Sequence, residues 1–154
     1  MKKILFLSFL FSIFAFADVN SNENKILPEN LNDNTLEFIK YIKDAGCKVG
    51  IAINPETDIE EIYKYLPYIH TVMIMTVHPG EGGQQLIPET ILKIKKLKNY
   101  LKQNSLENEI EVDGGVNLEN IRELNEAGAD IAVVGSFMIN SKDYKYTMEK
   151  LKQA

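Results

Sequence analysis

The chain has 154 residues, of which 45% are hydrophobic, and it carries a net charge of −5 at pH 7. That length and composition allow one compact domain, which can bury about 70% of the surface of its unfolded chain. The negative charge argues against a nucleic-acid surface as the main partner, and the single cysteine, Cys47, excludes an internal disulfide.

The N-terminus differs in character from the rest of the chain. It has two lysines, then a short apolar stretch, then the sequence Ala15-Phe16-Ala17. This pattern is typical of a secretory signal peptide cleaved before Asp18, although a buried first strand or helix is an alternative. The apolar stretch is too short for a comfortable membrane span. With the Asn-rich linker that follows, residues 1–24 are predicted to lie outside the folded part, residues 25–154, and membrane contact is expected only through an uncleaved signal.

Helical and strand patterns alternate from residue 34 onwards. Strands are predicted at residues 48–53, 71–77, 109–113 and 130–135, and helices at residues 34–46, 57–66, 88–102, 117–128 and 142–153. Strands that are apolar on both faces, separated by amphipathic helices, predict an α/β fold with a parallel sheet covered by helices.

Capping signals set the predicted helix boundaries. Asn34 is a candidate cap of the first helix, and Thr57 with Glu60 has the spacing of a capping box. Pro88 suits the first position of the third helix. Cys47 lies between a helix end and an apolar run, so we expect a small buried side chain there, not a nucleophile.

The loops that follow the predicted strands carry the candidate site, because ligands of parallel β/α folds bind at the carboxyl ends of strands. The first loop begins at Asn54, and the other three are rich in glycine: Gly80, Glu81, Gly82 and Gly83; Gly114 and Gly115; Gly135 and Ser136. Backbone N–H groups in such loops can bind an anion without Lys or Arg, and phosphate is the natural candidate. A single glycine pair is usually a turn, but three consecutive exits favour a binding site.

Asp113 stands at the exit of the third predicted strand, directly before Gly114 and Gly115. A carboxylate next to a phosphate site suits a general acid or base, or a metal ligand. The alternative is that Asp113 only caps its own turn.

Four segments resemble the C-terminal half of ribulose-phosphate 3-epimerase: GIAINPET, MTVHPGEGGQQLIPETILKIKKL, IEVDGGVNLENI and AGADIAVVGS. The resemblance runs in unbroken order from about Asn34 to the C-terminus. It implies a partial TIM-type barrel of about four parallel strands, each followed by a helix. It also implies interconversion of ribulose 5-phosphate and xylulose 5-phosphate, in the pentose phosphate pathway, with a divalent metal that is commonly zinc or iron.

The resemblance assigns roles to particular residues. Asp113 matches the acid that binds the metal and transfers a proton, and the three glycine loops match the phosphate-binding loops. Met75 matches a methionine near the reacting carbons, with plain core packing as the alternative. Inverting a carbon beside a carbonyl needs two acid/base groups, and Asp113 can be only one of them.

The pattern departs from the family in ways that limit these expectations. The family's second acid, its metal-binding histidines and a substrate-binding serine belong to the first half of the barrel, and no His-x-Asp motif occurs here. His70 is expected on the surface away from the site, His78 in a solvated loop, and Glu81 pointing outward from phosphate. The chain should therefore be impaired alone, with a second copy or a complementary N-terminal half closing the barrel.

Two questions stay open at this point. The substrate could be another ketose phosphate, such as allulose 6-phosphate, or the chain could be a non-catalytic phosphate-binding remnant. The signal-like start suggests export, whereas the chemistry suggests the cytoplasm.

Overall fold

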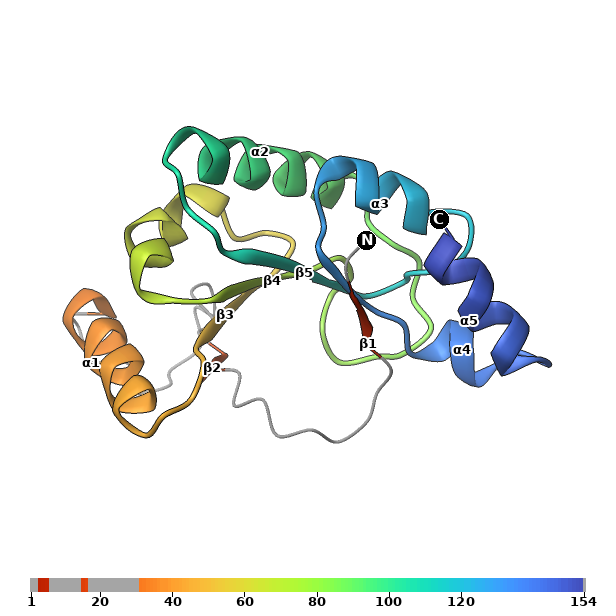
Figure 1. The fold of residues 1–154 in the computed structure, drawn as a ribbon, viewed down its shortest axis with the longest axis horizontal. Coiled ribbons are helices and arrows are strands. Elements are labelled where there is room, and N and C mark those ends of the chain that lie inside the picture. Colours follow the sequence, from red (N-terminus) through yellow and green to blue (C-terminus); the bar gives the residue numbers. More distant parts are fainter. Residues whose placement is uncertain (1–2, 6–14, 17–30, 154) are drawn as a thin grey trace.

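The computed structural model describes residues 3–5, 15–16 and 31–153, and its centre is one parallel sheet (Figure 1). The strand order is β1-β6-β5-β4-β3-β2. The strands are β1 (Lys3–Leu5), β2 (Ala15–Phe16), β3 (Gly50–Ile53), β4 (Thr71–Met75), β5 (Glu109–Asp113) and β6 (Ile131–Val133). The helices are α1 (Leu31–Asp44), the 3-10 helix η1 (Ile59–Tyr68), α2 (Glu89–Gln103), α3 (Ile121–Ala127), α4 (Ser136–Ile139) and α5 (Tyr144–Gln153).

The four predicted strands are confirmed as β3 to β6, each followed by a helix, so the structure is a partial β/α barrel. Two short strands come from the segment that the sequence analysis set aside. β1 pairs in parallel with β6, and β2 pairs in parallel with β3, so they occupy the two outer positions of the sheet. There they pair with strand edges that would otherwise be open.

These pairings depart, at five residues, from the expectation that residues 1–24 lie outside the fold. Cleavage before Asp18 would remove both β1 and β2. The signal peptide itself stays a prediction, since residues 1–2, 6–14 and 17–24 lie outside the described residues. In the described part of the chain, no helix is long and apolar enough to cross a membrane.

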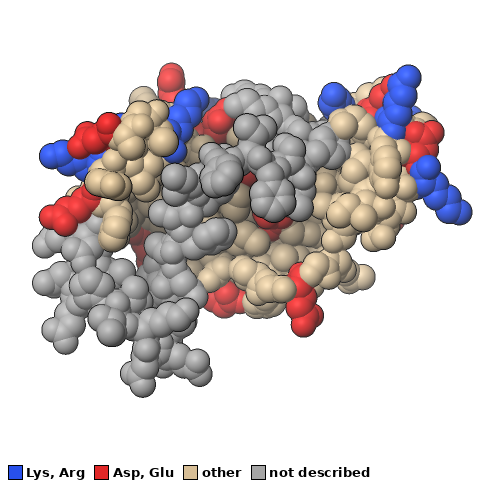
Figure 2. All heavy atoms as spheres, turned by 90° about the horizontal axis from the view of Figure 1, so that it is seen from below, with Lys and Arg blue, Asp and Glu red and all other residues tan. Residues whose placement is uncertain are grey.

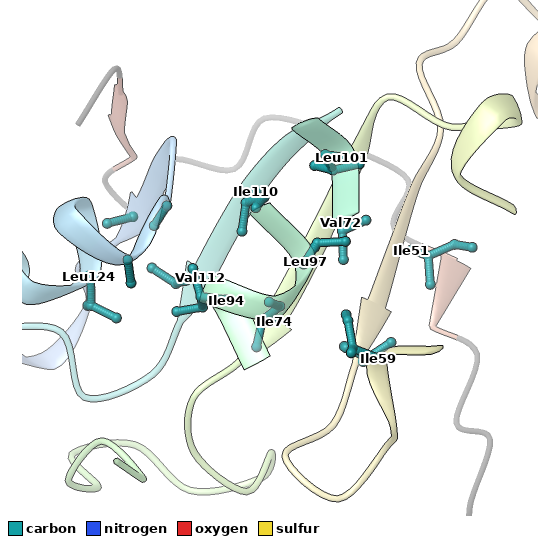
Figure 3. Packing of buried hydrophobic residues seen from close by; sticks show 14 of the residues in the cluster. Ile51, Ile59, Val72, Ile74, Ile94, Leu97, Leu101, Ile110, Val112 and Leu124 are labelled. Atoms are coloured by element: carbon teal, nitrogen blue, oxygen red, sulfur yellow. The ribbon is translucent and has the colours of Figure 1, made fainter. Parts of the chain in front are cut away.

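One face of the sheet packs against helices and forms the hydrophobic core (Figure 3). Apolar side chains of α2 recur every three or four residues, as an amphipathic helix requires, and those of Ile94 and Leu97 are fully buried. In Figure 3 they lie beside strand residues of the same cluster, among them Val72, Ile74, Ile110 and Val112. Because side chains alternate along a strand, the residues between these ones face the opposite side of the sheet.

Several local predictions need correction. The capping box of η1 is formed by Asp58 and Glu61, one residue later than predicted, because the Asp58 carboxylate accepts from the backbone N–H of Glu60 at 3.2 Å. Asn34 lies inside α1 rather than at its start, and Pro88 stands just before α2, at the N-cap position, without a side-chain capping hydrogen bond. Cys47 is exposed, not buried, because it sits in the connection between α1 and β3, before the strand enters the sheet.

Candidate active site

A cleft of about 1060 Å³ opens on the face of the sheet opposite the hydrophobic core. In the strand register Met75 lies opposite Asp113, and Asp113 lies opposite Val133, so the three side chains share one face. All three line the cleft. The predicted acid and the predicted methionine therefore reach the same space.

The three glycine-rich loops line the same cleft, and they approach one another closely. The predicted residues found there are Gly80, Glu81, Gly82, Gly83, Gly114, Gly115, Gly135 and Ser136. A Cβ atom placed on Gly82 would lie 3.5 Å from the hydroxyl oxygen of Ser136. The loops after β4 and β6 are thus in contact. The structure brings the predicted residues together, while their roles in binding remain predictions.

The turn after β5 needs glycine at both of its positions. Gly114 has a φ of 124° and Gly115 a φ of 65°, in the region that side chains disfavour. A Cβ atom on Gly114 would lie 2.9 Å from Cγ1 of Val77, and one on Gly115 would lie 2.9 Å from the carbonyl carbon of Gln85. The backbone of this turn is therefore packed directly against the loop after β4.

Side chains that the sequence analysis missed fix the shapes of these loops. The Gln84 amide donates to the carbonyl oxygens of His78 at 2.7 Å and Glu81 at 2.8 Å, which closes the loop after β4. The Asn120 amide donates to the carbonyl of Gly115 at 2.9 Å and holds the turn after β5. For Asn120, the sequence signal was the general tendency of Asn side chains to bond to nearby backbone groups.

The loop after β3 is held by a lysine of α2. The ammonium of Lys93 donates to the carbonyls of Asn54 at 3.2 Å and Pro55 at 2.8 Å, and also to that of Thr57. Burial lowers the pKa of Lys93. Asn54 does not line the cleft, so this exit supports the site from outside it.

The charge of the cleft is acidic. Its lining includes the carboxylates Glu81, Glu111, Asp113, Glu119 and Glu123, and none of the described lining residues is Lys, Arg or His. In Figure 2 the visible basic side chains lie toward the two sides of the molecule. An anion in this cleft would depend on backbone N–H groups for its binding.

Backbone N–H groups are indeed free for such a role. Within the described residues, the amides of Gly82, Gly114, Gly115 and Ser136 donate no hydrogen bond to the protein. All four residues line the cleft. Three consecutive strand exits therefore present unpaired donors to one space, which is the arrangement that binds anions without cationic side chains.

Asp113 is a half-buried titratable group that lines this cleft. Burial raises the pKa of its carboxyl above the usual value, because desolvation disfavours the charged form. A second carboxylate, Glu111, is buried two residues earlier on the same strand face and also lines the cleft. Sequence analysis missed Glu111 because it lies inside a strand, away from the exit.

The residues present do not complete a metal site. Asp113 can supply one ligand, but in the described ranges no group of three or more His, Cys, Asp or Glu side chains could hold a metal ion. His78 lies outside the cleft, where its Nδ1 is 2.7 Å from a carboxylate oxygen of Glu56 on the surface. His70 is exposed at the start of β4, and Glu81 is exposed at the rim. The expectations for His70 and His78 are confirmed, whereas the outward direction of the Glu81 side chain stays a prediction, since Glu81 also lines the cleft.

The arrangement defines a class of protein: a partial β/α barrel with its candidate ligand site at the carboxyl ends of the strands. Solved structures agree on the fold, among them a 3-hexulose-6-phosphate synthase with a TM-score of 0.58 and 16% identity, over 79% of this chain and 56% of that one. A mutant tryptophan synthase α-subunit from Pyrococcus furiosus has a TM-score of 0.56 and 21% identity, over 79% and 49%. The model of the ribulose-phosphate 3 epimerase family matches residues 11–139, and the chain belongs to this family.

Curated relatives support the assignment. Ribulose-phosphate 3-epimerases from Buchnera aphidicola (subsp. Baizongia pistaciae) and Helicobacter pylori are each 37% identical to this chain, over 91% and 92% of its length. The enzyme of that name from Chlamydia trachomatis is 40% identical over 77% of the chain. These matches cover 61%, 65% and 52% of the relatives' own lengths. The chain thus spans between half and two thirds of the relatives it matches.

Proposed function

We propose that this chain takes part in the 3-epimerisation of a ketose phosphate, as an isomerase that interconverts ribulose 5-phosphate and xylulose 5-phosphate. One observation carries the proposal: a carboxylate with a raised pKa, Asp113, shares a cleft with unpaired backbone donors from three consecutive strand exits. The family and the names of its relatives supply the substrate.

The phosphate group binds to the amides of Gly82, Gly115 and Ser136. The sugar then extends over the inner face of the sheet, toward Met75 and Asp113. The carboxylate of Asp113 removes the proton from C3, the C–H bond breaks, and its electrons form an enediolate with the neighbouring carbonyl. The raised pKa helps this step, because a more basic carboxylate accepts the proton more readily.

Inversion requires return of a proton to the opposite face of C3, and Asp113 lies on one face only. A closed barrel of this class has eight strands, whereas the sheet here has six, two of them very short. A second copy of the chain or a separate N-terminal half would supply the missing wall. The zinc or iron ion implied by the family would also need ligands beyond the described residues.

The test separates proton removal from inversion. The full chain is incubated with ribulose 5-phosphate in deuterium oxide, and NMR spectroscopy follows both deuterium at C3 and the appearance of xylulose 5-phosphate. Expected is deuterium incorporation with little product, and full epimerisation once an N-terminal half is added. The Asp113→Asn variant should bind phosphate but incorporate no deuterium, while Glu119→Gln, a change at the rim, should behave like the wild type.

Two outcomes would contradict the proposal in different ways. Binding of ribulose 5-phosphate without deuterium incorporation, even with an added N-terminal half, would favour a non-catalytic phosphate-binding protein. That alternative has one observation in its favour, namely the incomplete set of metal ligands among the described residues. If the chain neither binds ribulose 5-phosphate nor incorporates deuterium, both functions are rejected. Parallel runs with allulose 6-phosphate identify the preferred ketose.

A further inference from the structure

Thr76 is a buried residue that touches the candidate site without lining it. It directly follows β4, and 0% of its surface is exposed. Its backbone N–H donates to the carbonyl of Asp113 at 2.8 Å, and its hydroxyl donates to the carbonyl of Gly114 at 2.6 Å. One residue thus holds two successive peptide groups of the neighbouring strand exit.

These two bonds determine where the neighbouring amides point. In a trans peptide group the C=O and the N–H point in opposite directions. The carbonyls of Asp113 and Gly114 both point toward Thr76, so the N–H groups of Gly114 and Gly115 point away from it. Both glycines line the cleft, and neither N–H has a partner among the described residues.

From this geometry we infer that Thr76 is a positioning residue for anion binding: its hydroxyl aims the N–H of Gly115 at the bound phosphate. The inference rests on the proposed function, because it presumes an anion in the cleft. Without the hydroxyl, the carbonyl of Gly114 loses its partner and the peptide group between the two glycines is free to rotate. Glycines on both sides offer little steric resistance to such a rotation.

The backbone bond from Thr76 to Asp113 survives any substitution that keeps the strand, so the hydroxyl can be tested separately. Thr76→Val replaces the hydroxyl by a methyl group of similar size, and Thr76→Ser keeps the hydroxyl but loses the methyl group. Thr90 offers a matched control on α2, because it is 2% exposed and its hydroxyl donates to the carbonyl of Ile87 at 2.6 Å. Thr90 does not line the cleft.

The experiment titrates the full-length wild type and these three variants with inorganic phosphate, following backbone amide signals by NMR. Thr76→Val should weaken phosphate binding about tenfold, whereas Thr76→Ser and Thr90→Val should stay within about threefold of the wild type. In Thr76→Val, the phosphate-dependent shift of the Gly115 amide should also shrink. A merely structural role would give equal binding in Thr76→Val and Thr90→Val.

The outcomes are distinct. If the wild type binds phosphate and Thr76→Val binds it equally well, the inference is overturned and the proposed function stands. Weakening to the same extent in Thr76→Ser and Thr76→Val would overturn it as well, because the hydroxyl would then be irrelevant. The inference and the proposed function are rejected together if the wild type shows no response to phosphate or to ribulose 5-phosphate at the amides of Gly82, Gly115 and Ser136.

Discussion

Replacing Gly115 by alanine tests whether the strand exits meet as closely as the structure has them. A Cβ atom there would lie 2.9 Å from the carbonyl carbon of Gln85 and 3.0 Å from the carbonyl oxygen of Gln84, and it would also meet the amide nitrogen of Leu86. These neighbours are backbone atoms, which cannot turn aside as a flexible side chain can. The loop after β4 must therefore move away from the turn after β5.

Two terms contribute to the expected loss of stability. Placing alanine at a φ of 65° costs about 1 kcal/mol, and displacing packed backbone costs about 1–3 kcal/mol more. Gly46 isolates the first term, because its φ is 78° and nothing lies within 4 Å of its Cβ position. We therefore expect Gly115→Ala to lower the free energy of unfolding by about 2–4 kcal/mol, against about 1 kcal/mol for Gly46→Ala.

Urea denaturation followed by circular dichroism measures both variants, and a phosphate titration measures their binding. Gly115→Ala should also lose phosphate affinity, because its amide would shift with the turn, whereas Gly46→Ala should bind like the wild type. Equal losses of stability in the two variants would show that the loops do not approach each other here. Phosphate binding by Gly115→Ala at wild-type strength would refute the assignment of its amide to the site.

Three further predictions concern charge. Burial raises the folded-state pKa of Asp113 above its unfolded value, so the contribution of this carboxyl to stability is present at low pH and is lost as pH rises through the folded pKa. Asp113→Asn should therefore be more stable than the wild type near neutral pH, and this advantage should fade in acid. Urea denaturation midpoints measured across pH test this. Phosphate affinity should rise about twofold from low salt to about 0.15 M ionic strength, since salt screens the acidic lining, and a fall measured by calorimetry would point to an unrecognised cation in the site. Lys93→Met should lower the free energy of unfolding by about 2–4 kcal/mol, because three backbone carbonyls lose their donor. The control Lys96→Met removes an exposed ion pair with Glu60 and should change the urea midpoint little. Similar losses of stability in both variants would contradict the role of Lys93.

The central sheet and the gathering of the site were predictable because they follow from local patterns. Apolar runs between amphipathic helices favour a parallel sheet with helices packed against it. Parallel strands bring their carboxyl ends to one side, so Asp113 and the glycine loops had to share an edge of the sheet. Gly128, at a φ of 112°, ends α3 where the sequence placed a stop.

Errors arose where contacts distant in the sequence, or competing local ones, decide the structure. Both Thr57 and Asp58 have side chains that can cap a helix. Asp58 caps η1, whereas Thr57 is buried. The strands Lys3–Leu5 and Ala15–Phe16 were not predicted, and they pair with β6 and β3. Composition cannot show which strand edge a short apolar stretch will meet.

Local patterns were enough to establish that strands and helices alternate and that an acid and several glycines follow the strands, because periodicity and turn residues are local properties. Three features came from the folded arrangement alone: Gly115 packs on the backbone of the loop after β4, Thr76 holds the turn after β5, and Glu111 lies buried two residues before Asp113. These facts depend on strand register and on hydrogen bonds between residues about 30 to 40 positions apart, as between Thr76 and Gly114. Such pairings are selected by the packing of the whole sheet, and no single stretch of sequence encodes them.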